Sequence, residues 1–174
     1  MRSFRRFLIF LPVCTGLRIT VDFFLVMLSP KMAFHLRLTS PSDPRFLSVV
    51  RAVVGELGVI YGLSNEECIE VTLAVDEALA NIIRHAYKNC YDREMEFECD
   101  VNEEQMEFTL LDHGEPPDPT KICGKPLDEF ALSGRGTHLI KAIMDEMSYE
   151  KVPRGNQLKL VKRLPGAKAA RPAE

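Results

Sequence analysis

Three groups of residues in this sequence have the types and spacing to bind a phosphorylated ligand. The first is Glu77-x-x-x-Asn81-x-x-x-His85, within a stretch that has the apolar spacing of a long helix. Four-residue intervals place these side chains along one side of that helix. A carboxylate and an amide oxygen suit Mg²⁺, which prefers hard oxygen ligands and keeps substrate phosphates in its shell. An exposed polar stripe has the same pattern, so the spacing alone leaves both interpretations open.

The second group is Asp112 with Gly114, at the end of a predicted strand. A carboxylate in that position can accept a hydrogen bond from an adenine amino group. A glycine two residues later lets the backbone approach a flat ring closely. An ordinary turn uses Asp and Gly as well, so this pair is not decisive by itself.

The third group, Gly134-Arg135-Gly136, opens a predicted helix. Glycines there let backbone N–H groups reach a phosphate, and the helix N-terminus favours negative charge. Arg135 can add a charge-assisted contact. A single G-x-G is a weak signal when taken alone. We assign Gly155, further along the chain, to a hairpin turn.

Periodicity around these groups predicts an α+β two-layer sandwich, with helices on one face of a mixed, mainly antiparallel sheet. The long helix begins at a capping box formed by Ser64 and Glu67. Residues 112–133 form a Pro- and Gly-rich loop of a length that is usually functional. The predicted strands are 33–38, 94–101, 105–111, 147–152 and 157–164, and the predicted helices are 42–61, 64–88 and one starting at 134.

The predicted strand 94–101 alternates apolar residues with four acidic ones. Glu94, Glu96, Glu98 and Asp100 fall on one face of it. We expect that face to be acidic and solvated, as in a sheet that is covered on one side only.

Composition excludes several classes of protein. The 174 residues carry a net charge of -3, and the basic clusters are short, so direct nucleic-acid binding is not expected. The five cysteines are odd in number and none are in C-x-x-C spacing, which argues against a disulfide framework or a zinc site. Reduced cysteines fit a cytoplasmic protein.

Residues 1–31 differ from the rest of the chain. Three arginines precede an uncharged apolar run from residue 7 to residue 17. This segment is a hydrophobic N-terminal extension with three interpretations: translation from a mis-assigned start upstream of Met32, a signal or membrane anchor, or a folded extension. The predicted domain spans residues 32–164, and residues 165–174 form a tail that we expect to be disordered.

Together and in this order, the three groups resemble the N, G1 and G2 boxes of the GHKL superfamily. The resemblance is strongest to its small anti-sigma-factor serine/threonine kinase branch and covers about residues 33–164. The most specific segment is Asp-Glu-Ala-Leu-Ala-Asn-Ile-Ile-Arg-His-Ala-Tyr at 76–87. Ser-Gly-Arg-Gly-Thr-His-Leu-Ile at 133–140, followed by Met-Asp-Glu at 144–146, is nearly as specific.

The resemblance implies a Bergerat ATP-binding fold that uses ATP and Mg²⁺. Glu77 is then the general base for the attacking hydroxyl, and Asn81 is the Mg²⁺ ligand. Asp112 holds adenine with Gly114 beside it, under a lid formed by residues 115–133. The residues expected around the phosphates are Gly134 and Gly136, with Arg84, His85 and Arg135 at the border of the phosphate site.

The implied activity is phosphorylation of a Ser or Thr on a STAS-type anti-sigma antagonist. Such a kinase would also sequester a sigma factor, which it releases when the antagonist binds, and the branch is compatible with a homodimer. One alternative is a regulatory module that binds ATP without transferring phosphate. Another is the catalytic half of a histidine kinase, which is disfavoured because the chain has no room for a dimerisation helix pair.

Overall fold

The computed structural model describes residues 33–116 and 135–165. The N-terminal extension, Gly134, most of the predicted lid and the tail beyond residue 165 lie outside these described residues, so the predicted domain boundaries stay predictions. Within the described part of the chain, no helix is long and apolar enough to cross a membrane.

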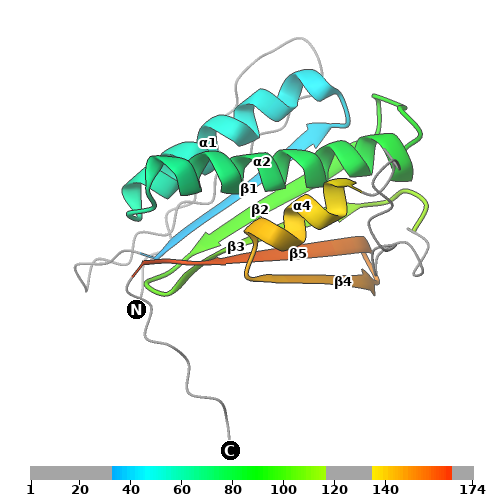
Figure 1. Ribbon diagram of the computed structural model, residues 1–174. Coiled ribbons are helices and arrows are strands. Elements are labelled where there is room, and N and C mark those ends of the chain that lie inside the picture. The colour runs from blue at the N-terminus through cyan, green and yellow to red at the C-terminus, as the bar shows by residue number, and fades with distance from the viewer. Residues whose placement is uncertain (1–32, 117–134, 166–174) are drawn as a thin grey trace, which may run out of the picture.

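Five strands form one sheet in the order β1-β2-β3-β5-β4, and every neighbouring pair is antiparallel (Figure 1). The predicted α+β sandwich is confirmed, and the sheet is fully antiparallel rather than mixed. β2 has the predicted bounds, and the other four strands are one to two residues longer than predicted. Their bounds are β1 Phe34–Pro41, β2 Glu94–Val101, β3 Gln105–Asp112, β4 Glu146–Val152 and β5 Gly155–Arg163.

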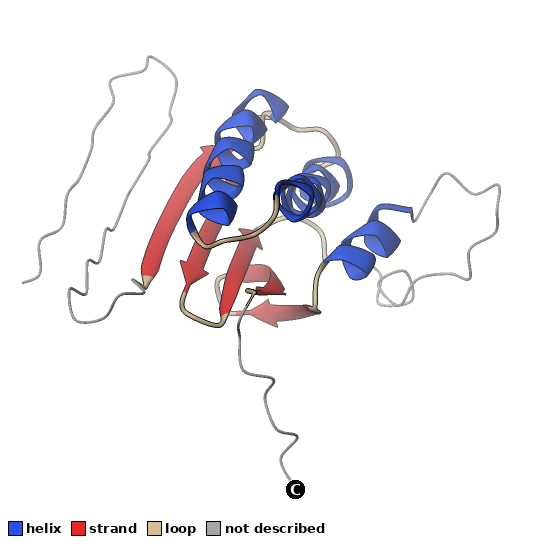
Figure 2. Ribbon diagram, turned by 60° about the vertical axis from the view of Figure 1, so that its left-hand side comes forward, coloured by secondary structure: helices blue, strands red, loops and turns tan. Residues whose placement is uncertain are grey.

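The helices lie on one face of this sheet (Figure 2). They are the 3-10 turn η1 Pro44–Phe46, α1 Leu47–Ile60, α2 Asn65–Asn81, the π-helical turn η2 Ile82–Ala86, and α4 Arg135–Ile143. We call the face beneath them the covered face, represented by the buried residues Phe97, Phe108 and Leu160. Apolar stripes of α1 and α2 pack on these side chains because burying that surface is the main gain from folding.

Local sequence signals set the start of each long helix. Asp43 caps the first turn by accepting a hydrogen bond from the Arg45 N–H at 2.9 Å. The preceding residue, Ser42, is buried, and its hydroxyl donates a hydrogen bond to the Cys90 carbonyl at 2.6 Å. The capping box of α2 is present as predicted: the Ser64 N–H donates to Glu67 at 2.8 Å, and the Glu67 N–H donates to the Ser64 hydroxyl at 3.2 Å.

The prediction that α2 continues to about Lys88 is wrong. Regular α-helix ends at Asn81, and the widened turn η2 follows, in which the Tyr87 N–H donates to the Ile82 carbonyl at 3.0 Å. The reason is tertiary: the turn places Tyr87 in the core. There its hydroxyl donates to the Glu94 carbonyl at 2.5 Å and accepts from the His113 N–H at 2.9 Å. π-Helical turns of this kind occur frequently at functional sites.

We call the opposite side of the sheet, against which no described helix packs, the open face. Glu96, Glu98 and Asp100, three of the four acidic residues of the expected stripe, are paired with basic side chains from neighbouring strands and turns, so most of that stripe is an ion-paired surface. The pairs are His35–Asp100 at 2.7 Å, Lys159–Glu107 at 2.7 Å, Arg154–Glu96 at 2.7 Å and Arg37–Glu98.

Candidate functional site

Asp112 ends β3 on the covered face and is 5% exposed. Its Oδ1 accepts the Gly114 N–H at 2.8 Å and the Asn156 side-chain amide at 2.9 Å. Burial raises the pKa of this carboxyl group, and the two hydrogen bonds oppose that rise only in part. Within the described chain, these bonds end on Oδ1. Oδ2 accepts neither of these two hydrogen bonds.

Two glycines let the backbone close tightly around Asp112. A Cβ on Gly114 would lie 2.5 Å from the Ala86 carbonyl oxygen, so the chain after β3 rests directly on η2. A Cβ on Gly155 would lie 2.2 Å from the Asp112 carbonyl oxygen, and Gly155 also has a φ of +139°. Both positions therefore require glycine, for lack of space and, at Gly155, for backbone conformation as well.

Sequence reasoning missed Asn156 and the second role of Gly155. Gly155 does form the hairpin turn as expected, but it also packs on Asp112. Asn156 is 3% exposed, faces Asp112 in the β3–β5 register, and also donates to the Gly114 carbonyl at 3.0 Å. Because that register joins residues 44 apart in the chain, the only local signal was a Gly-Asn pair that reads as a turn.

The group on α2 is held together by Arg84. Its Nη2 donates to Glu77 Oε1 at 2.7 Å and to Asn81 Oδ1 at 3.1 Å. A guanidinium therefore contacts the same two oxygen-bearing side chains that the sequence assigned to catalysis and to Mg²⁺. The hard oxygens of these two side chains are of the type that a magnesium ion prefers.

Gly136 brings α4 against this group. A Cβ at Gly136 would lie 2.0 Å from Glu77 Oε1, closer than any real contact, so the backbone of α4 touches the carboxylate directly. The structure thus joins the first and third sequence groups, which are separated by more than fifty residues in the chain. Gly134 and the side chain of Arg135 lie outside the described residues.

The segment η2 connects the two parts of the site. Arg84, toward one end of η2, contacts Glu77. At the other end, the backbone of Ala86 packs against Gly114, and its carbonyl accepts a hydrogen bond from the Glu115 N–H at 3.1 Å. His85 lies between them and is exposed. The arrangement offers a buried acceptor at one end and a carboxylate, an amide and a guanidinium at the other, which suits an elongated ligand with a polar ring and an anionic tail.

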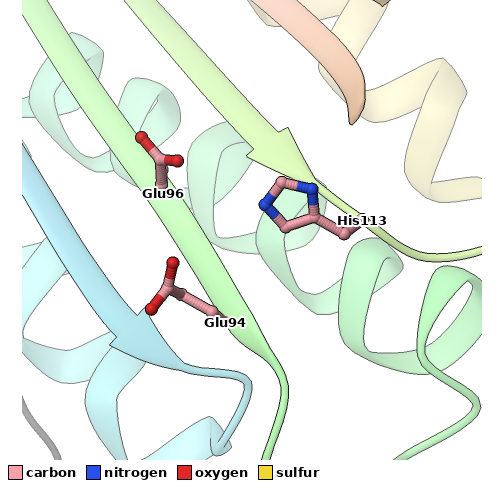
Figure 3. Close-up of side chains that lie close together, drawn as sticks. All are labelled: Glu94, Glu96 and His113. Atoms are coloured by element: carbon pink, nitrogen blue, oxygen red, sulfur yellow. The ribbon is translucent and has the colours of Figure 1, made fainter. Parts of the chain in front are cut away.

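A second cluster lies close to Asp112 in the chain. Glu94 and Glu96 on β2 and His113 just beyond β3 point toward one another, with their ligand atoms all within 4.8 Å (Figure 3). Glu96, however, already accepts hydrogen bonds from Arg154 at 2.7 and 2.9 Å and lies 3.4 Å from Arg37. Guanidinium groups therefore compensate its charge, and we assign this cluster to the ion pairing of the open face.

Comparison with known proteins identifies the family to which this chain is similar. A model of the family described as histidine kinase-like ATPase domain matches residues 40–162. The chain is 26% identical over 125 residues to the serine-protein kinase RsbW of Bacillus licheniformis, covering 67% of this chain and 78% of that protein. It is 24% identical to the serine-protein kinase RsbW of Bacillus subtilis (strain 168), covering 66% and 77% respectively.

A solved structure has the same fold. The crystal structure of the RsbU and RsbW domains of Rv1364c from Mycobacterium tuberculosis superimposes with a TM-score of 0.54 at 16% sequence identity. The superposition covers 75% of this chain and 32% of that one, so this chain spans about a third of the solved protein. At this identity the likeness concerns the fold alone.

Proposed function

This chain belongs to the histidine kinase-like ATPase domain family, and on that premise we propose that it binds ATP and transfers the γ-phosphoryl group to a protein Ser or Thr. The observation that carries this proposal is the meeting of Glu77 with the start of α4 at Gly136. That contact puts a carboxylate beside a helix N-terminal segment, where phosphate groups bind favourably.

At the adenine end of the proposed site, Asp112 accepts a hydrogen bond from the amino group of the base. The Asn156 amide holds the carboxyl group by its Oδ1, which leaves Oδ2 to face the ligand. Gly114 provides the close backbone approach next to the ring. The buried setting strengthens this hydrogen bond because competing water is excluded.

At the phosphate end, Asn81 is the proposed Mg²⁺ ligand, and the ion would supply charge neutralisation for the phosphates. Arg84 donates to the oxygens of Glu77 and Asn81 at 2.7 and 3.1 Å. Its guanidinium would turn toward the phosphates on binding and leave Glu77 free. Gly134, Gly136, Arg135 and His85 are proposed to border the same phosphates.

Glu77 would then act as the general base. Its carboxylate accepts the proton of the incoming Ser or Thr hydroxyl while that oxygen attacks the γ-phosphorus, the bond from the γ-phosphorus to the β,γ-bridging oxygen breaks, and ADP leaves with that electron pair. Most of the catalytic effect in such transfers comes from positioning and charge stabilisation, so a precise setting of Glu77 against α4 is central to the proposal.

The proposed protein substrate is a STAS-type anti-sigma antagonist, with a sigma factor as a second partner and a homodimer as the assembly. Relatives named serine-protein kinase RsbW, at about 25% identity, support this choice. The proposed folded unit is residues 32–164.

Neighbouring acids on α2 give a matched test. Glu77→Ala should abolish phosphate transfer from Mg-ATP to a STAS-type antagonist yet keep nucleotide binding. Asp76→Asn is the control, because Asp76 pairs with Arg51 on α1 at 2.7 Å, away from the proposed phosphates. Transfer is followed as radiolabel on the antagonist. Normal transfer by Glu77→Ala would show that Glu77 is not the base.

The contact between Arg84 and Glu77 also favours a second candidate, a regulatory module that binds ATP without transfer. In that contact the guanidinium occupies Oε1 of Glu77, one of the two oxygens that a general base would present to the substrate hydroxyl. Stoichiometric ATP binding with no phosphate on any antagonist serine or threonine would support the module and exclude the kinase.

A further inference from the structure

Tyr149 on β4 carries a polar atom that the fold leaves unsatisfied. Its hydroxyl oxygen is buried and has no hydrogen-bond partner in the described part of the chain. A buried hydroxyl without a partner destabilises a protein, because the group has lost its bonds to water. Phenylalanine would fill the same space without that cost, so the hydroxyl itself requires an explanation.

Tyr87 provides an internal comparison. Its hydroxyl is also in the core of the same sheet, and it both donates to the Glu94 carbonyl and accepts from the His113 N–H. Where a tyrosine has a purely structural role in this molecule, its hydroxyl is fully used. The Tyr149 hydroxyl has no such partner among the described residues, which leaves it open to a group from outside the described fold.

The register places Tyr149 on the same face as Asp112. Tyr149 pairs with Leu158 of β5, and Leu158 pairs with Leu110 of β3. Asp112 lies two residues beyond Leu110 and therefore points to the same side of the sheet. Asn156, which holds Asp112, is the diagonal neighbour of Tyr149 across the β4–β5 pair.

The two side chains also influence each other electrostatically. Burial raises the pKa of the Tyr149 hydroxyl, and the charge of Asp112 raises it further. The hydroxyl nevertheless makes no hydrogen bond to that carboxylate. A potential proton donor and a potential acceptor thus lie on the same face of the sheet, near enough to influence each other, without bonding to each other.

We propose that the Tyr149 hydroxyl is a second recognition group for the base of a bound adenine nucleotide, donating to a ring nitrogen while Asp112 accepts from the amino group. This rests on the proposed ATP site. Adenine presents an amino donor beside a ring-nitrogen acceptor, whereas guanine presents an acceptor oxygen in place of the amino group. An Asp and Tyr pair therefore matches adenine and opposes guanine.

The test is Tyr149→Phe in the full chain, titrated with ATP and with ADP by calorimetry and melted without nucleotide. Affinity should fall about threefold to tenfold, the effect of one neutral hydrogen bond, and by the same factor for both nucleotides, since they share the base. The nucleotide-free Tm should stay the same or rise. Tyr87→Phe is the control and should lower the Tm, because it leaves two buried backbone groups without partners.

Each other outcome overturns the inference in a recognisable way. Unchanged affinity shows that the hydroxyl does not contact the nucleotide. A larger loss for ATP than for ADP moves the contact to the phosphates. A Tm lowered as in Tyr87→Phe shows a structural hydroxyl. If the wild-type chain binds neither nucleotide, the proposed function fails as well, whereas wild-type binding with an unaffected variant removes only the role of Tyr149.

Discussion

The two faces of the sheet use carboxylates in opposite ways. On the open face, Glu96, Glu98 and Asp100 each pair with a basic side chain. On the covered face, Asp112 is more deeply buried and is held by neutral donors, the Asn156 amide and the Gly114 N–H. The acid that has lost most water is thus the one without a charged partner among the described residues.

This difference separates structural acids from functional ones. A surface ion pair has its charge compensated within the fold and contributes little to stability. A buried carboxyl group that accepts hydrogen bonds from neutral donors on one oxygen only is poorly stabilised in the protein without ligand. It therefore gains the most free energy when a ligand donates a hydrogen bond to its other oxygen. A pattern of acidic residues in the sequence does not distinguish the two cases, whereas their partners in the structure do.

The largest effect should come from adding one methyl group on the covered side. Gly136→Ala places a Cβ 2.0 Å from Glu77 Oε1, so α4 or the carboxylate must move. A displacement of about 1 Å can cost on the order of 100-fold in rate, and we expect at least that loss of phosphate transfer. Overpacking should also lower the free energy of unfolding by about 1–3 kcal/mol.

The matched control is Gly55→Ala in α1. A Cβ there would meet only the Thr72 hydroxyl, at 3.8 Å, an ordinary contact. It should leave transfer unchanged and stabilise the helix by up to about 1 kcal/mol. Full activity of Gly136→Ala would remove the contact on which the proposed function depends.

A smaller effect is expected behind Asp112. In Gly155→Ala, the alanine would have to adopt a φ of +139°, and its Cβ would lie 2.2 Å from the Asp112 carbonyl oxygen. The substitution should therefore lower the free energy of unfolding by about 1–3 kcal/mol and weaken ATP binding. Gly62→Ala separates the two causes, because Gly62 has a φ of +85° but nothing within 4 Å. Chemical denaturation should show a smaller loss of unfolding free energy for Gly62→Ala than for Gly155→Ala. ATP titration should show no binding defect for Gly62→Ala.

Acidification should affect the two faces differently. Because burial raises the pKa of Asp112, the folded protein holds this proton more tightly than the unfolded chain. The contribution of Asp112 to stability is therefore greatest below the ordinary aspartate pKa and is lost as pH rises through the raised value. As pH rises through that window, the free energy of unfolding of the wild-type protein should fall relative to that of the Asp112→Asn variant.

ATP affinity should change in the opposite sense, because the ionised carboxylate is the acceptor. It should fall as pH is lowered through the same window, toward the affinity of the Asp112→Asn variant. A pH titration of affinity that follows only the ordinary aspartate range would contradict the buried environment of Asp112.

The smallest effect is expected on the open face. Glu98→Gln removes the charge partner of Arg37 from a partly exposed pair, and should cost less than about 1 kcal/mol in unfolding free energy. ATP affinity should not change. A binding defect from this substitution as large as that from Asp112→Asn would erase the distinction between the two faces.

Features with local causes were predictable from the sequence. The capping box of Ser64 and Glu67 depends on residues three apart, and the strands follow from period-two alternation. The apolar stripes likewise predicted which face of α2 is buried. The three groups of candidate site residues were proposed from their types and order.

Features that depend on tertiary contacts were not predictable. The π-helical turn exists because Tyr87 reaches Glu94 and His113 across the sheet. The role of Asn156 depends on the β3–β5 register, and the bond from Arg84 to Glu77 depends on how an exposed arginine turns back along the helix. Secondary-structure propensity and the spacing of residues along the chain give no information about any of these contacts.

The central claim, that the unpaired buried acid is reserved for a nucleotide, is tested most directly by titrating Mg-ATP into the full chain and into Asp112→Asn by calorimetry. We predict that the wild-type chain binds and that the variant loses at least about tenfold in affinity, the value of a hydrogen bond to a charged group. Its nucleotide-free Tm should not fall, since asparagine can still accept from Asn156 and Gly114. Equal binding by the folded variant, or no binding by the folded wild type, would contradict the account.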